Sequence, residues 1–175
     1  LATQNPIEQE GTYPLPEAQL DRFMFMINLD YPSVADEIAI VSETTSENNV
    51  KVNPVLTAED VVFFQNLLRR VPVNNNVVKY AVNVVAQTRP GTATASADAN
   101  KYLNWGAGPR ASQNLILGAK MHAVSVGKYS PDIEDVQYVA TAVLRHRIVR
   151  NYKAEAEHVT NDDIINRILK STPYF

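Results

Sequence analysis

The chain has 175 residues, with 16 lysine and arginine residues against 19 aspartate and glutamate residues, and a formal net charge of −3. This mild acidity argues against a protein that coats nucleic acid or an anionic membrane through bulk charge. The chain contains no cysteine, which excludes disulfides, cysteine-ligated zinc and thiol catalysis. No apolar run approaches the roughly 20 residues that a membrane helix needs, and no signal peptide is recognisable. We therefore expect a cytoplasmic protein without membrane insertion and without nucleic acid as a partner.

The first thirty residues differ in pattern from the rest of the chain. Residues 1–5 resemble a strand end that runs into a turn, because Pro6 biases the residue before it away from the helical region. Residues 16–22 suit a brief helix with proline near its first position. The apolar run at residues 23–29 has the length of a buried strand, and once exposed it should be covered by self-association or by packing onto the rest of the chain. Strand, helix and strand in this order predict that residues 1–32 are a remnant of an α/β domain.

From about residue 33 onward the pattern is helical, and the expected class is mainly α. Thr57 and Asp60 have the spacing of a capping box. One N-cap stays open, because either Ser130 or Asp132 can begin the fifth helix. Residues 91–100 read as a pliable loop, and the path of residues 91–107 stays open. The expected helices of the unit 33–175 lie at about 33–45, 57–71, 77–89, 110–126, 132–149 and 161–170.

Two nucleotide-binding motifs fail on inspection. The pair Gly127-Lys128 is followed by Tyr129 rather than by serine or threonine, and His122 stands where a phosphate loop has its first glycine. The segment from Gly106 to Ala111 formally fits a relaxed dinucleotide fingerprint. It lacks a parallel-sheet context, and its proline removes an amide that a pyrophosphate would use, so we reject it.

Arg110 occupies an unusual place in the first turn of a predicted helix, where acidic residues are favoured. A cation there makes physical sense if an anion lies between it and the free backbone amides. The alternative is that Arg110 reaches into solvent or pairs with a nearby carboxylate, and chemistry alone favours that alternative.

Two further polar residues have a plain and a functional interpretation. Arg22 can form a surface ion pair with Glu17 or Asp21, which chemistry alone favours, or it can be an exposed arginine that reaches a phosphate on a neighbouring subunit. Asn5 can form an Asx turn before proline, or it can orient a water molecule at a strand end.

The remaining candidates favour structural roles. The basic residues between 145 and 153 are expected to form a solvated face late in a helix, where cations complement the helix dipole. The three histidines lack the spacing of metal ligands, and no metal site is expected.

Taken together, these features resemble one family, the MoxR-type AAA+ ATPases. The resemblance covers nearly the whole chain. One departure is visible, since Asp132-Ile133 stands where the family usually has Thr-Pro. The motifs that carry the resemblance are the runs 2–8 and 11–23 of the ATPase core, Thr88-Arg89, the helix start at 108–112, and the closing-helix segments 134–136 and 143–147.

The resemblance implies a fold and a set of site residues. Residues 1–32 correspond to the end of the α/β ATPase core, and residues 33–175 to the helical lid. Asn5 matches the sensor-1 position, which orients the attacking water, and Arg22 matches the arginine finger that acts on ATP bound by the next subunit. Arg110 matches sensor 2, through which the lid contacts phosphate.

The resemblance also implies the cofactors and partners. The intact protein is expected to use ATP and Mg²⁺ and to form a subunit ring that remodels or matures partner proteins, with von Willebrand factor A domain proteins as the implied class. The family's phosphate loop and Mg²⁺-binding strand lie upstream of sensor 1, and the chain begins at that motif with Leu1. The chain alone is therefore expected neither to bind ATP tightly nor to hydrolyse it. The rival hypothesis is a helical interaction or adaptor module without catalysis.

Overall fold

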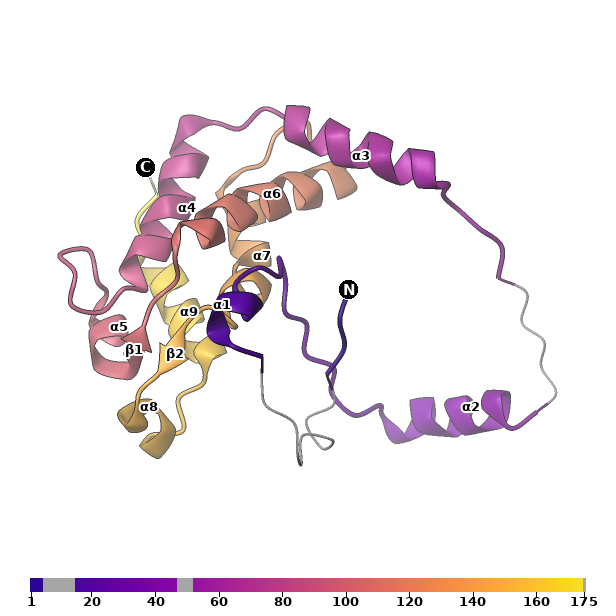
Figure 1. Cartoon of the computed structure of the whole chain (residues 1–175), viewed down its shortest axis with the longest axis horizontal. Coiled ribbons are helices and arrows are strands. Elements are labelled where there is room, and N and C mark those ends of the chain that lie inside the picture. Colours follow the sequence, from indigo (N-terminus) through magenta and orange to yellow (C-terminus); the bar gives the residue numbers. More distant parts are fainter. Residues whose placement is uncertain (5–14, 47–51, 175) are drawn as a thin grey trace.

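The computed structural model describes residues 1–4, 15–46 and 52–174, and over these residues the chain is mainly helical, with nine helices and one two-stranded sheet (Figure 1). The mainly α class expected from the sequence is confirmed. The elements are α1 (Glu17–Leu20), α2 (Val34–Thr44), α3 (Ala58–Arg70), α4 (Asn75–Gln87), α5 (Ala97–Tyr102), β1 (Leu103–Trp105), α6 (Pro109–Ser125), α7 (Ile133–Leu144), β2 (Val149–Arg150), α8 (Tyr152–Ala156) and α9 (Asn161–Ser171).

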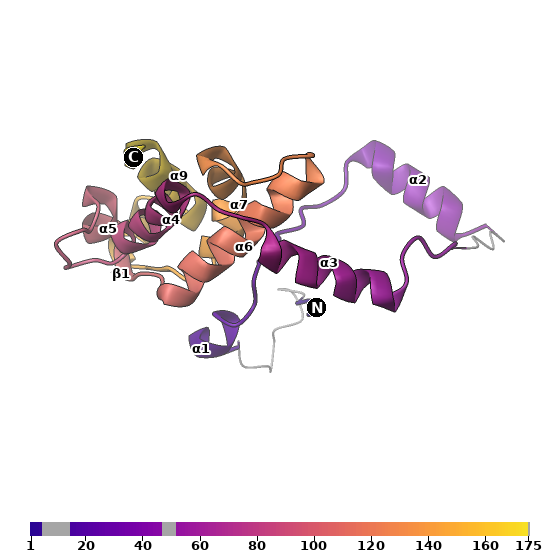
Figure 2. The ribbon, with the colours of Figure 1, turned by 90° about the horizontal axis from the view of Figure 1, so that it is seen from above.

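A bundle of α4, α6, α7 and α9 contains the hydrophobic core. Helix α6 packs along both α4 and α7, and α9 closes the other side of α7 (Figures 1 and 2). Apolar side chains recur at helical spacing along these helices, so each one buries a single stripe. The largest fully buried apolar side chains are Tyr80, Leu115, Leu144, Ile164, Ile165 and Ile168.

The helix starts follow local sequence signals. Thr57 and Asp60 form the expected capping box at the start of α3, and Thr160 caps α9. The open choice at α7 is settled in favour of Asp132, which exchanges hydrogen bonds with Asp135 three residues later.

The segment between α4 and α6 is more ordered than a pliable loop. It contains α5 and the strand β1, which pairs antiparallel with β2, and α5 packs on α8 and α9. The expected helix 132–149 ends at Leu144, and its last residues instead form a turn and then β2. Short elements of this kind depend on tertiary contacts rather than on local propensity, which is why the periodicity did not indicate them.

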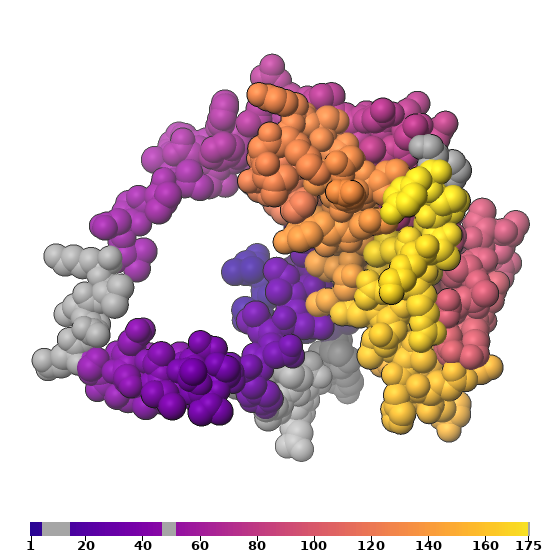
Figure 3. Space-filling view, turned by 180° about the vertical axis from the view of Figure 1, so that it is seen from behind, coloured from indigo at the N-terminus to yellow at the C-terminus, as the bar shows by residue number. Residues whose placement is uncertain are grey.

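Helix α2 lies away from the bundle, with open space between them, whereas α3 contacts α6 of the bundle (Figures 1 and 3). Neither helix has a buried residue, and apolar side chains such as Ile38, Phe63 and Phe64 are exposed. The proposed division of the chain at residues 32 and 33 remains a prediction.

The expected strand at residues 23–29 is wrong. The described residues of 1–32 hold the short helix α1 and no strand. A strand needs a neighbouring strand for its backbone hydrogen bonds. Here the run bonds to a helix instead, since the Met26 amide donates to the carbonyl of Ala142 in α7 at 2.9 Å.

Residues 24–26, in the middle of this run, pack onto the helical bundle, as one of the two expected outcomes. Phe25 is half-buried and contacts the core, and its ring lies over Gly118 of α6 beside Val139 of α7. Ile27 and Leu29 remain exposed.

Within the described residues, no helix is both long enough and apolar enough to cross a membrane.

Candidate functional site

Arg110 lies at the second position of α6, after Pro109, as the sequence predicts. The start of α6 differs from those of the other described helices of eleven or more residues. Each of those has an N-cap side chain bound to a backbone amide, whereas the N-cap of α6 is Gly108, and its first turn holds no acidic residue. The first amides of α6 therefore lack a side-chain acceptor, and a cation stands beside them.

The segment before α6 is held by the end of α4. The buried Thr88 hydroxyl accepts a hydrogen bond from the Ala107 amide at 3.0 Å, and the Arg89 Nε donates to the Ala107 carbonyl at 2.9 Å. A Cβ atom on Gly106 would lie 2.3 Å from the carbonyl oxygen of Thr88, so only glycine permits this approach. This brace fixes where α6 begins and hence where Arg110 projects.

Arg110 pairs with a carboxylate, which was the plainer of its two interpretations. Its Nη1 atom lies 2.5 Å from Oδ2 of Asp21, and the Arg110 side chain remains 48% exposed. The pair joins the start of α6 to the turn after α1, 89 residues earlier in the chain. The structure thus brings Arg110 next to the segment that carries Arg22.

Arg147 is a residue that the sequence analysis misjudged. It was expected on a solvated helix face, but it follows the end of α7 and its side chain is only 1% exposed. Its Nε donates to Oδ1 of Asp21 at 3.0 Å, and its Nη atoms donate to four carbonyl oxygens. These carbonyls belong to Asp21, Phe23, Met24 and Val143.

The other two arginines of this run also bind protein groups. Arg145 forms an ion pair with Asp162 at 2.8 Å, and Arg150 donates to the carbonyl of Val159 at 3.0 Å. The expected solvated face is therefore wrong for the three arginines, which have acceptors on other segments, whereas Lys153 is exposed as expected. The sequence did contain a signal for these contacts. Several arginines follow the end of a helix directly, where backbone carbonyl oxygens lack partners within the helix.

His146 and Arg147 bind residues 21–24, and we call these contacts the clamp. Burial changes the pKa values of both residues. Desolvation lowers the pKa of Arg147, although its bond to Asp21 opposes that effect. Desolvation also lowers the pKa of His146, whose Nε2 lies 3.0 Å from the Phe23 carbonyl oxygen. Arginine keeps its charge under any such shift, so Arg147 is a buried permanent cation that needs Asp21 as counter-ion.

Arg22 directly follows Asp21, and its side chain is exposed. The expected alternative, an ion pair with Glu17 or Asp21, is not formed among the described residues, where Asp21 serves Arg110 and Arg147 instead. The structure ties Arg110 to Asp21, the residue directly before Arg22. Asn5 lies outside the described residues, and its role stays a prediction.

The described residues fit part of what a nucleoside triphosphate requires. An uncapped helix start with an exposed arginine suits a phosphate group, and a second exposed arginine lies on the segment to which the first is tied. Within the part of the chain that the structure describes, no group of three or more histidine, aspartate or glutamate side chains is arranged to hold a metal ion.

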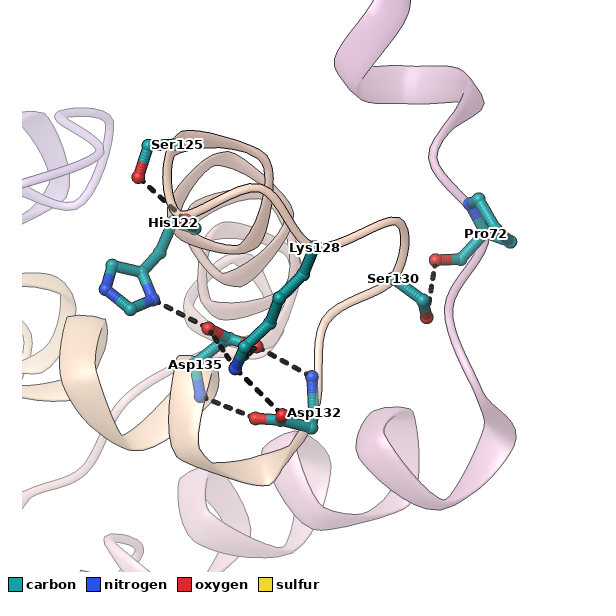
Figure 4. A network of polar contacts seen from close by, with 7 residues as sticks. All are labelled: Pro72, His122, Ser125, Lys128, Ser130, Asp132 and Asp135. Carbon is teal, nitrogen blue, oxygen red and sulfur yellow. Dashed lines mark hydrogen bonds and ion pairs between the residues drawn. The ribbon is translucent and has the colours of Figure 1, made fainter.

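A second polar cluster joins α6 to α7, and of this cluster the sequence indicated only the Asp132 cap (Figure 4). The fully buried Asp135 carboxylate accepts from Lys128 at 3.1 Å and from the Asp132 amide at 2.8 Å, and it lies 2.7 Å from Nδ1 of His122. Burial alone would raise the pKa of Asp135. The bonds from the Asp132 amide, His122 and Lys128 outweigh burial and hold the pKa below its usual value.

Comparisons with known proteins match two parts of the chain to family models. Residues 95–168 match the AAA lid domain, and residues 1–25 match the ATPase family associated with various cellular activities (AAA). The chaperone MoxR1 of Mycobacterium tuberculosis is 38% identical over 171 residues, which cover 98% of this chain and 45% of that protein. The protein YeaC of Bacillus subtilis is 33% identical, over 98% of this chain and 51% of that protein.

A solved structure has the same fold. The crystal structure of a candidate ATPase from Cytophaga hutchinsonii matches with a TM-score of 0.89 and 36% identity, over 98% of this chain and 52% of that chain. The chain thus spans about half the length of the relatives that it matches. These matches show that the chain contains the C-terminal AAA lid region of a MoxR-family AAA ATPase and is homologous to the chaperone MoxR1 over nearly its whole length.

Proposed function

We propose that this chain is the part of a ring-forming ATPase that senses bound ATP with Arg110 and presents Arg22 to the ATP of the next subunit. The observation that carries the proposal is the ion pair between Asp21 and Arg110, at 2.5 Å. It ties the uncapped start of α6 to the residue directly before Arg22. The two arginines that family resemblance assigns to phosphate thus lie on segments that touch.

The chemistry proposed for these residues is electrostatic. ATP with Mg²⁺ supplies the phosphoryl group and the metal charge when bound in the intact protein. Arg110 and the free amides of α6 bind phosphate oxygens, and Arg22 offsets the negative charge that develops during transfer to water. Asn5 orients the attacking water.

The biological use of the cycle rests on resemblance to chaperone MoxR1. ATP-dependent movement of the lid against the core would drive chaperone-like remodelling of partner proteins by the ring. Proteins with von Willebrand factor A domains are the proposed class of partner.

The test is turnover of the full-length protein in which Arg22 is replaced. Arg22→Ala should lower kcat by about 1,000-fold or more, because an arginine finger contributes on that scale, while ATP affinity stays within about two-fold. Arg69→Ala is the matched control, since Arg69 is also an exposed arginine, in the last turn of α3. Wild-type turnover in the Arg22 variant would refute the finger assignment.

The assignment of Arg110 is tested by binding rather than by turnover. Arg110→Ala should weaken ATP binding about ten-fold, the loss of one charge-assisted contact. Unchanged affinity and unchanged turnover in both variants would favour the rival hypothesis, a helical adaptor module without catalysis.

A further inference from the structure

Asp21 is a single carboxylate shared by two arginines from different parts of the lid. Its Oδ2 atom binds Arg110 at the start of α6, and its Oδ1 atom binds Arg147 after the end of α7. A carboxylate can accept from two arginines at once, one on each oxygen. Asp21 is therefore the point at which the two ends of the α6–α7 pair meet the segment that carries Arg22.

The two partners hold Asp21 with different strength. The Arg147 side chain is 1% exposed and is also bound to four carbonyl oxygens. If it broke its bond to Asp21, its buried positive charge would lack a counter-ion, which is costly. The Arg110 side chain is 48% exposed, and Asp21 is its one ion-pair partner among the described residues. Exposed pairs of this kind contribute little to stability. The bond to Arg110 is thus the one that can be exchanged for another anion.

We propose that Asp21 is a positioning residue that couples the two phosphate-directed arginines: it holds Arg110 when no nucleotide is bound, and it releases Arg110 when that side chain turns to a phosphate. This inference rests on the proposed function. A phosphate group carries more negative charge than a carboxylate and accepts bidentate bonds from arginine, so it competes effectively with Asp21.

The release of Arg110 from Asp21 affects Arg22 because Asp21 and Arg22 are neighbours in the same turn. The turn that presents Arg22 is closed by two hydrogen bonds, from the Arg22 amide to Gln19 at 3.1 Å and from the Phe23 amide to Leu20 at 3.0 Å. Asp21 lies inside this turn, and losing one of its two arginines removes half of its side-chain anchorage. The state of a subunit's own nucleotide site therefore changes the arginine offered to the neighbouring site, and by linkage the effect is reciprocal.

The test is ATP affinity of the full-length protein with Asp21→Asn, measured with a non-hydrolysable ATP analogue and Mg²⁺. Removing the competing charge should tighten binding by about two- to five-fold, the range expected for loss of a surface pair. A purely structural role for Asp21 would weaken binding or leave it unchanged. Asp98→Asn is the matched control, because Asp98 and Arg167 are 32% and 46% exposed against 31% and 48% for Asp21 and Arg110.

The Arg110→Ala background separates this inference from the proposed function. The Asp21→Asn effect should vanish there, since no arginine remains to be released. If Arg110→Ala weakens binding but Asp21→Asn does not tighten it, the coupling is overturned and the sensor assignment stands. If Arg110→Ala leaves affinity unchanged, both are overturned.

A second measurement avoids the risk that Asp21→Asn unfolds the clamp. Amide hydrogen exchange of wild-type protein should become faster at residues 21–23 when the ATP analogue is added, and this change should be absent in Arg110→Ala. Unchanged or slower exchange at these amides in the wild type would overturn the release.

Discussion

Arg147 binds the side chain of Asp21, 126 residues earlier in the sequence, with its Nε 3.0 Å from Oδ1. The same guanidinium also donates to the main-chain carbonyls of Asp21, Phe23 and Met24. One buried side chain thus supplies hydrogen-bond donors to the carbonyl groups of a segment that has no neighbouring strand. This contact fixes the segment on the lid and so determines where Arg22 projects.

Replacing Arg147 should detach that segment. We expect Arg147→Ala to lower the free energy of unfolding by about 3 kcal/mol, at the low end for a broken buried pair because Asp21 is partly exposed. Arg147→Lys should not restore the loss, since an ammonium group cannot reach five acceptors in a fork. Urea denaturation measures the loss. Arg167→Ala, which breaks an exposed pair with Asp98, should cost at most about 1 kcal/mol, and an equal loss in both variants would contradict the clamp.

His146 should make the clamp sensitive to mild acid. Its buried Nδ1 has no hydrogen-bond partner in the described part of the chain, and burial with the nearby cations Arg145 and Arg147 lowers its pKa, while Asp21 and the Phe23 carbonyl oppose this. The unfolded state therefore binds the proton more readily, so stability rises with pH through this region and is lost as the pH falls below about 6.5. We expect a lower urea midpoint at pH 5.5 than at pH 7.5.

The matched variants for this pH dependence are two histidine substitutions. His146→Gln keeps a donor for the Phe23 carbonyl but cannot titrate, so it should flatten the dependence. His158→Asn changes an exposed histidine in a left-handed turn and should leave the wild-type slope. An unchanged slope in the His146 variant would contradict the assignment.

Gly106 and Gly108 differ in what a methyl group would meet. A Cβ on Gly106 would overlap the backbone of Thr88 and Arg89, whereas nothing lies within 4 Å of a Cβ on Gly108. We expect Gly106→Ala to destabilise the lid by about 1–3 kcal/mol, as overpacking does, and to displace the start of α6. Gly108→Ala should change stability by less than about 1 kcal/mol. Thermal denaturation of both variants measures the contrast, and equal melting temperatures would show that the brace is not rigid.

Local signals in the sequence predicted the long helices well. The capping box of α3 depends on residues three positions apart, and the structure has it in place; α4 and α9 also lie close to their expected ranges. The short elements α5, β1, β2 and α8 were missed, because they form only where distant segments meet.

The candidate site was predicted only in part, for the same physical reason. Position in a helix first turn singled out Arg110, but nothing local links Asp21 to residues 89 and 126 positions away. The strand expected at residues 23–29 is wrong because the run packs against helices rather than beside another strand. The run is apolar as expected, but it has a bend at residues 23 and 24 and no regular structure after it, and helices α6 and α7 supply its contacts.

Asp135 should govern the acid stability of the junction between α6 and α7. Its pKa is held below the usual value by the Asp132 amide, His122 and Lys128, which together outweigh burial, so its contribution is present above about pH 4 and is lost as the pH falls through the lowered value. Asp135→Asn should cost about 2 kcal/mol at pH 7 and flatten the decline between pH 5 and pH 3, as followed by urea denaturation. Asp163→Asn is the control, because Asp163 has the same place in the capping box of α9 but is exposed, and it should cost about 1 kcal/mol or less. If the two variants lose the same stability and keep the same pH dependence, the buried network of Figure 4 contributes no more than an ordinary helix cap.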